Sequence, residues 1–451
     1  MKGKIIKLKN GGVLVYSRSK LNSSTAVEVG FRAGAICDKE PGTAHFLEHS
    51  LFKKTKNRTN EEVERDRNKI AFLNASTAMD YLVIKFFRTN KLVLKTMDFA
   101  YDVLMNSIID DEYVETEKGV IKEELKMCLD DEVRDVYLKN YKQATSESRV
   151  SSDIVGKTEK NIDSINFNDI QKFKKDYFVG NNFIVSVVSS LPLCKVKKMI
   201  NKCFVERIPQ NVNAKPAKNH FDLIDVDKTT SLKVFKQNQE KVSVLMSFKL
   251  NANEFDIFGK NYNYTFLSRF LSGSQGRLFL SLRNKGLIYK LNSDISTFKN
   301  TSLFNINFES SKEKIKQILE EIKDEVKMLV NEKVDDDLVK EYQNNLEYLS
   351  DEKMPTRMSA VCHVNLMDYL TMGKLFHLTK RQKKALRKDV SSVKIQNAAR
   401  EIFNKGNEMF VTVLGDVSKT NVPDVNWFKE NFLIAEWVWN DWWWKKTYWK
   451  I

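Results

Sequence analysis

Two histidines and a glutamate lie close together near the start of the chain, in the stretch TAHFLEHSLFKK (43–54). His45 and His49 are four residues apart, so on a helix both imidazoles lie on one face, within reach of a single ion. Imidazole is a good zinc ligand. Glu48 precedes the second histidine and could take a proton from an attacking water, as a general base does. The alternative is an amphipathic helix in which these polar residues coincide by chance.

The order H-x-x-E-H is the inverse of the zincin order H-E-x-x-H. A third ligand is needed, and the helical pattern VETEKGVIKEELKMCLDD (114–131) offers one. Glu117 and Glu124 are two helical turns apart and share a face, so Glu124 could complete the site and Glu117 could orient a ligand histidine. Glu123 points about 100° away from Glu124. The alternative is a charged face exposed to solvent, which spacing alone does not exclude.

The elements that must position these residues follow from the hydrophobic pattern. Residues 42–55 and 59–71 favour helices, residues 79–87 favour a strand, and residues 91–150 are helical in pattern. The glutamate pair therefore lies on a helix that is separate from the helix of the histidines.

An internal duplication organises the chain. Residues 163–190 and 389–418 share the order of capped helix, aromatic residue, Asn-containing turn and valine-rich strand, about half a chain apart. Two domains of similar size follow, each an α+β unit. The predicted boundaries are 1–210 for the zinc-binding domain, 211–225 for a polar linker, 226–422 for the second domain and 423–451 for a tryptophan-rich C-terminal extension.

Composition bounds the class of protein. The chain has 451 residues and is 42% hydrophobic, which fits a folded protein of more than one domain. Its formal charge is +15, but no basic tract is interleaved with aromatic residues, so we expect no nucleic-acid partner. Five scattered cysteines, with no C-x-x-C, and the lack of a secretory signal pattern favour the cytoplasm. No run approaches the ~18 apolar residues of a transmembrane segment.

The stretch GTAHFLEHSLFKKT, taken with the spaced glutamates, resembles the signature of the pitrilysin and insulin-degrading family of zinc metallopeptidases, the inverzincins. That family includes the mitochondrial processing peptidases, and the chain is similar to its short-chain bacterial type. The resemblance implies one Zn²⁺ per chain, held by His45, His49 and Glu124. It also implies that Glu48 is the general base and that Glu117 orients a ligand histidine.

The resemblance extends to two further segments. It implies that NASTAMDYLVIKFF begins an edge strand to which a peptide substrate adds as another strand. The residues of that substrate strand are Asn74, Ala75, Ser76 and Thr77. In FLSGSQGRLFLSLRNKGLIYKLNSDIS (270–296), an arginine and a tyrosine that hold the substrate backbone in the family correspond to Arg283 and Tyr289. They are one residue closer together here than in the family.

The implied fold is α+β, with two homologous domains that each pack helices on a largely antiparallel sheet and together form half of a clamshell. The implied function is that of a zinc-dependent endopeptidase, which cleaves extended peptides or short unfolded segments, as in peptide processing or leader-peptide trimming. A second peptidase chain would complete the chamber, as a homodimer or as a heterodimer with a sister subunit. We expect a bacterial, cytoplasmic enzyme. The alternative is a non-catalytic scaffold or regulatory subunit of a heterodimeric peptidase.

Overall fold

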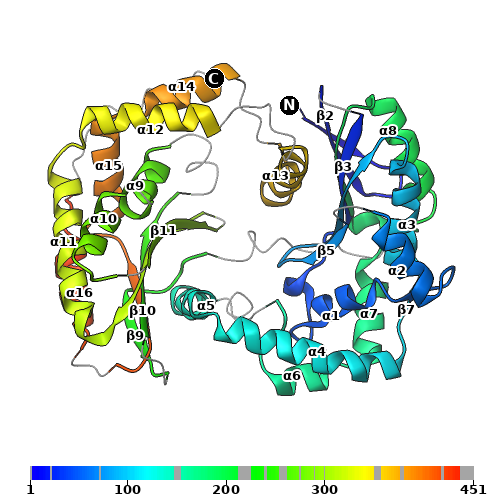
Figure 1. Ribbon diagram of the computed structural model, residues 1–451, viewed down its shortest axis with the longest axis horizontal. Helices are drawn as coiled ribbons and strands as arrows, with labels where there is room; N and C mark the ends of the chain where they lie inside the picture. The colour runs from blue at the N-terminus through cyan, green and yellow to red at the C-terminus, as the bar shows by residue number, and fades with distance from the viewer. Residues whose placement is uncertain are drawn as a thin grey trace. The chain divides into compact units, whose positions relative to one another are not determined.

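Two compact units, each built on one β-sheet, make up the computed structural model of the chain (Figure 1). The described residues are 3–20, 23–70, 73–146, 154–211, 225–237, 241–252, 262–273, 276–288, 290–298, 300–349, 357–375, 380–417 and 421–436. The first unit comprises the described residues of Met1–Asp131, Glu147–Ile224 and Asp351–Leu378. The second comprises those of Glu132–Ser146, Asp225–Ser350 and Thr379–Ile451.

The first unit is built on a six-stranded sheet. Its strands, in spatial order, are β1 (Gly3–Lys7), β2 (Val13–Arg18), β8 (Phe183–Ser189), β3 (Ser24–Phe31), β6 (Leu82–Thr89) and β5 (Asn74–Thr77). Neighbouring strands are antiparallel except β2 and β8, which are parallel. The central strands β8 and β3 are rich in valine and almost wholly buried, as expected of strands covered on both faces. Strand β5 forms one edge of the sheet.

Helices cover both faces of this sheet. The helices of the first unit are α1 (Thr43–Ser50), α2 (Asn60–Asn68), α3 (Val93–Asn106), α4 (Asp111–Asp130), α6 (Glu159–Ser164), α7 (Phe167–Tyr177), α8 (Leu193–Ile200) and α13 (Arg357–Met372). One face forms a core in which Phe46 of α1 and Met97 of α3 pack with Ile84 of the sheet. The other face packs against Leu366 and Leu370 of α13. A small two-stranded sheet joins β4 (Lys54–Thr55) to β7 (Ser107–Ile108).

The second unit is built on a five-stranded sheet. Its strands, in spatial order, are β11 (Lys290–Thr297), β12 (Ser302–Ser311), β10 (Lys241–Leu250), β13 (Met409–Leu414) and β9 (Ser231–Phe235). Its helices are α5 (Glu132–Ala144), α9 (Asn263–Ser272), α10 (Arg277–Asn284), α11 (Ile315–Asn331), α12 (Asp336–Leu349), α14 (Lys380–Asp389), α15 (Ser392–Ile402) and α16 (Val425–Phe432). Its core joins the sheet to α9, α11, α15 and α16.

The two sheets share one topology, which agrees with the duplication predicted from the sequence. The order β2-β8-β3-β6-β5 in the first unit corresponds to β9-β13-β10-β12-β11 in the second. The only parallel pairs among the described strands are β2 with β8 and β9 with β13, at equivalent positions. The repeated segment is α7 followed by β8 in one copy and α15 followed by β13 in the other.

Two helices do not belong to the unit that their position in the sequence suggests: α5 comes from the first half of the chain but belongs to the second unit, and α13 comes from the second half but belongs to the first unit. Helix α5 packs on β13 and β10, where the side-chain amide of Asn140 donates to the Phe410 carbonyl at 3.1 Å. Helix α13 packs on β8 and β3, where the Ser186 hydroxyl donates to the Cys362 carbonyl at 2.7 Å. The contiguous domain boundaries predicted above assign α5 to the first domain and α13 to the second, so the structure corrects them at these two helices. Contacts between residues far apart in the sequence hold each helix in its unit, and a hydrophobic pattern does not reveal such contacts.

Three predicted features lie partly or wholly beyond the described chain. Residues 212–224 of the predicted linker and 437–451 of the tryptophan-rich extension are outside the described residues, as is Tyr289. Within the described residues, no helix is long and apolar enough to cross a membrane.

Candidate metal centre

Helix α1 carries both histidines. It runs from Thr43 to Ser50, shorter than the predicted 42–55, and its apolar residues pack into the core of the first unit. That packing fixes the opposite face, from which the imidazoles project. His45 is 7% exposed, and the two imidazole rings have their centroids 4.6 Å apart. The spacing of four residues thus produces the shared face that the sequence predicts.

Helix α4 carries the glutamates. Its N-terminus is capped by Asp110, whose Oδ1 accepts the backbone N–H of Tyr113 at 2.9 Å. Glu117 and Glu124 both face α1, as their spacing of two turns predicts. Glu123 instead points to solvent and pairs with Lys126 at 2.8 Å.

Three donor side chains converge between these helices. Nε2 of His45 lies 3.5 Å from Oε1 of Glu124, and Nε2 of His49 lies 3.3 Å from Oε2 of the same carboxylate. One ligand atom of each residue lies within 4.8 Å of the other two, and no other group of three such residues is found within the described chain. The hydrogen bond with His45 holds the pKa of Glu124 below its usual value, with further contributions from the charge of both histidines.

These distances fit a zinc ion. With zinc–nitrogen and zinc–oxygen distances of about 2.0–2.1 Å, neighbouring donors of a tetrahedral site are about 3.4 Å apart. The nearest carboxylate oxygen of Glu124 lies at about this distance from each histidine, Oε1 from His45 and Oε2 from His49. Two imidazoles and one carboxylate are also the donor set of several catalytic zinc sites, which keep a fourth position open.

Glu117 lies behind the cluster, against His49. Nδ1 of His49 and Oε1 of Glu117 are 2.8 Å apart, so the carboxylate can fix the orientation of the ring and leave Nε2 toward Glu124. Lys53 approaches Oε2 of Glu117 to 3.9 Å. Burial, together with the charge of Glu117, raises the pKa of Tyr113 on the same helix. Sequence reasoning found Glu117 but missed Lys53 and Tyr113, which no spacing rule connects to the histidines.

Glu48 lies beside His49 on α1 and is partly exposed. Its carboxylate makes no hydrogen bond or ion pair with any other described residue. An unpaired, partly exposed carboxylate next to a candidate metal position is available for proton transfer.

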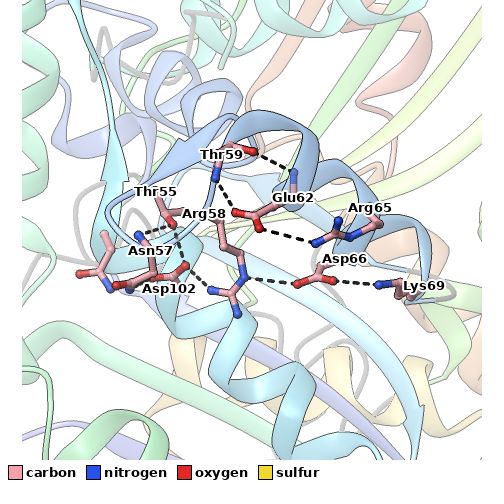
Figure 2. Close-up of polar contacts among 10 residues, drawn as sticks. Thr55, Asn57, Arg58, Thr59, Glu62, Arg65, Asp66, Lys69 and Asp102 are labelled. Atoms are coloured by element: carbon pink, nitrogen blue, oxygen red, sulfur yellow. Dashed lines mark hydrogen bonds and ion pairs between the residues drawn. The ribbon is translucent and has the colours of Figure 1, made fainter.

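A polar network fixes the segment that follows α1 (Figure 2). The buried carboxylate of Asp102 on α3 accepts hydrogen bonds from Thr55 at 2.7 Å and Asn57 at 2.5 Å, and it also pairs with Arg58. Arg58 in turn pairs with Asp66 of α2 at 3.3 Å. Burial tends to raise the pKa of Asp102, but its hydrogen bonds outweigh that effect and lower it. The network holds the segment that follows α1 against helices α3 and α2.

The predicted substrate strand is the edge strand β5. Asn74, Ala75, Ser76 and Thr77 pair antiparallel with β6, opposite Lys85 to Leu82, and helix α1 packs close to this strand. The strand therefore lies next to the helix of the histidines.

Arg283 is an exposed residue in the last turn of α10, in the second unit. Tyr289 lies outside the described residues, so the roles of both stay predictions.

Comparison with protein families finds two matches that together span most of the chain. The sequence model "Insulinase (Peptidase family M16)" matches residues 13–158, which include all three donors of the cluster. The model "Peptidase M16 inactive domain" matches residues 164–346.

Curated relatives carry related names. The chain is 26% identical to an uncharacterized zinc protease of Rickettsia bellii over 340 residues, which cover 73% of this chain and 78% of the relative. It is 24% identical to the uncharacterized zinc protease YmxG of Bacillus subtilis, over 76% of this chain and 82% of the relative. It is 31% identical to the probable mitochondrial-processing peptidase subunit beta of Schizosaccharomyces pombe, over 44% of each chain.

Solved structures show the same fold. A protease from Helicobacter pylori has a TM-score of 0.77 at 21% identity, covering 92% of this chain and 99% of its own. A peptidase M16 inactive domain from Pseudomonas fluorescens has a TM-score of 0.78 at 14% identity, covering 93% and 99%. The family models, the zinc proteases among the relatives and the shared two-domain α+β fold agree, and the chain belongs to the insulinase family of peptidases, M16.

Proposed function

We propose that this protein is a zinc-dependent endopeptidase that cleaves extended peptides or short unfolded segments. The observation that carries this proposal is the convergence of His45, His49 and Glu124, which place one ligand atom each within 4.8 Å of the other two. In this proposal the three residues hold one Zn²⁺ per chain. When bound, the ion would polarise a scissile carbonyl and lower the pKa of a water molecule toward neutrality.

Two glutamates beside the cluster have separate roles in this proposal. Glu48 takes a proton from the attacking water and returns it to the leaving amine, a role for which its unpaired carboxylate on the ligand helix is suited. Glu117 holds the ring of His49 through the contact of 2.8 Å at Nδ1, which keeps Nε2 directed at Glu124.

Strand β5 offers the means of binding a peptide. Its residues Asn74, Ala75, Ser76 and Thr77 pair with β6 on one side, and on the other they form the edge of the sheet. An extended peptide can add to such an edge through backbone hydrogen bonds, which give affinity without demanding a particular sequence. We propose that Arg283 and Tyr289 contact the substrate as well, a role carried over from the family by position.

We propose that a second peptidase chain completes the chamber around the substrate, in the manner of a clamshell. A homodimer or a heterodimer with a sister subunit would both serve, and several relatives of this chain are named as the beta subunit of a processing peptidase.

All five cysteines are described and free of disulfides, which supports a reducing, cytoplasmic compartment. Processing of precursor peptides, such as the trimming of leader peptides, is the role we propose there.

Replacing Glu48 by glutamine tests the mechanism. The variant keeps all three donors, so we expect it to bind zinc, whereas its cleavage of unstructured peptides should fall about a hundredfold to ten-thousandfold. Glu123→Gln is the matched control, because Glu123 is exposed and pairs only with Lys126 among the described residues. A chelator should abolish the activity of the wild type. A Glu48→Gln variant that cleaves as fast as the wild type would exclude Glu48 as the base.

A non-catalytic subunit is the second candidate function. It is favoured by the match of residues 164–346 to a family model described as inactive. This candidate predicts that the wild type, alone or with any sister subunit, cleaves no member of a broad peptide library even when it is loaded with zinc. Cleavage by the wild type that requires Glu48 would exclude it.

A further inference from the structure

The helix that carries both histidines begins without a side chain at its cap position. Helix α1 follows Gly42, whose φ of 97° is left-handed and which has no side chain to accept the first backbone N–H groups of the helix. A Cβ at this position would lie 2.5 Å from the carbonyl oxygen of Val155, so the position requires glycine. An acceptor for the first turn must come from elsewhere in the chain.

The carboxyl group of Asp38 supplies that acceptor. Its Oδ2 accepts the backbone N–H of Gly42 at 2.8 Å, and its Oδ1 accepts the backbone N–H of Ala44 at 2.9 Å. Ala44 is adjacent to His45, which lies in the first turn of α1, whereas His49 lies in the last. Asp38 therefore holds the part of the helix that carries one of the two imidazoles.

The backbone donors of this cap favour the ionised form of Asp38. Burial raises the pKa of its carboxyl group to about 8, and the backbone N–H groups of Ala44, Gly42 and Thr43 act against that rise.

The segment that holds Asp38 is itself attached to the end of the edge strand. The backbone N–H of Asp38 donates to Ala35 at 3.1 Å, in a single turn of 3₁₀-helix that covers Ala35–Cys37. The N–H groups of Ala35 and Ile36 donate to the carbonyls of Ala78 and Met79, both at 3.0 Å. Ala78 directly follows β5, so a continuous chain of hydrogen bonds connects β5 to the first turn of α1.

We propose that Asp38 is a positioning residue of the metal centre, which caps α1 so that His45 presents its Nε2 to Glu124. This inference rests on the proposed function, because it concerns the same centre. Without the cap, the first turn of an eight-residue helix would fray and displace His45. His49 would keep its place through its separate contact with Glu117 at 2.8 Å. The loss should therefore appear as weaker zinc binding by a folded protein.

The test measures zinc affinity in the purified full-length chain, by competition with a chromophoric chelator. Asp38→Ala removes both acceptors, and its dissociation constant for zinc should rise about tenfold, the lower end of what loss of a residue supporting a metal ligand costs. Asp38→Asn keeps one oxygen acceptor, so its dissociation constant should rise by a smaller factor than that of Asp38→Ala. Thr59→Ala is the control, because Thr59 caps α2 in the same way, through the N–H of Glu62 at 3.3 Å, on a helix without donors of the cluster.

Thermal unfolding of the metal-free proteins completes the comparison. Asp38→Ala and Thr59→Ala should both unfold at lower temperature than the wild type, yet only the first should bind zinc more weakly. Wild-type zinc affinity in a folded Asp38→Ala variant would overturn the inference. If that variant does not fold, wild-type affinity in Asp38→Asn overturns it instead. Failure of the wild type to bind zinc would refute the proposed function itself, which separates the two failures.

Discussion

Replacing Glu117 by glutamine removes the negative charge behind His49 and keeps the size of the side chain. Oε1 of Glu117 lies 2.8 Å from Nδ1 of His49, and the Glu117 side chain is only 9% exposed, so water screens the contact little. A hydrogen bond to a charged group contributes about 1.5–3 kcal/mol. Since about 1.4 kcal/mol changes an equilibrium constant tenfold, the dissociation constant for zinc should rise about tenfold to a hundredfold.

The two ends of that range correspond to two variants. Glu117→Gln retains an amide oxygen that can accept from Nδ1 of His49, so we expect the lower end for it. Glu117→Ala leaves the ring without an acceptor, so we expect the upper end. Competition with a chelator gives both constants. Glu115→Gln is the matched control, because it removes the same charge from the same helix, at a side chain that is 70% exposed and pairs with Lys118.

The reasoning fails if Glu117→Gln and Glu117→Ala bind zinc as tightly as the wild type. It also fails if Glu115→Gln weakens zinc binding by the same factor, since the effect would then reflect the net charge of α4. A folded Glu117→Ala variant with a tenfold or larger loss, beside an unchanged Glu115 variant, is the result that the geometry predicts.

Three further outcomes are expected. Glu124→Gln should lose zinc on dialysis and Glu123→Gln should retain it, as metal analysis of both proteins would show; full occupancy without Glu124 would refute the ligand assignment. Asp102→Ala should lower the free energy of unfolding by about 3 kcal/mol, because it leaves Arg58 without its buried partner; urea titration measures this. The pKa of Asp102 is lower in the folded state than in the unfolded state. Its contribution to the free energy of unfolding is therefore fully present above the unfolded pKa of about 3.9 and is lost as the pH falls through the lowered pKa. An Asp102→Asn variant that loses stability in acid as steeply as the wild type would contradict this.

Much of the cluster could be predicted because helical spacing decides which side chains share a face of α1 and which share a face of α4. The four-residue separation of His45 and His49 and the seven-residue separation of Glu117 and Glu124 each place two side chains on one helix face. The structure brings these two faces together. The position of Glu123, pointing to solvent, follows from the same geometry.

The contacts that sequence reasoning missed depend on the path of the chain between elements. Asp38 reaches the start of α1 across a segment that ends at Gly42, which adopts a left-handed conformation. The assignment of α5 to the second unit and of α13 to the first depends on contacts between distant residues, such as the hydrogen bond from Asn140 to the Phe410 carbonyl. Neither kind of contact leaves a periodic signal in the sequence.

The duplication also bears on why a single candidate centre is found within the described residues. Helix α1 follows β3 and packs by the edge strand β5, and α9 follows β10 and packs by the equivalent edge strand β11. The same scaffold therefore presents a helix at the same place in both units. Helix α9, however, reads NYTFLSRFLS and contains no histidine or carboxylate, so it has no donor for a metal. Helix α1 therefore carries candidate donors and helix α9 carries none, which is why we expect one zinc ion per chain.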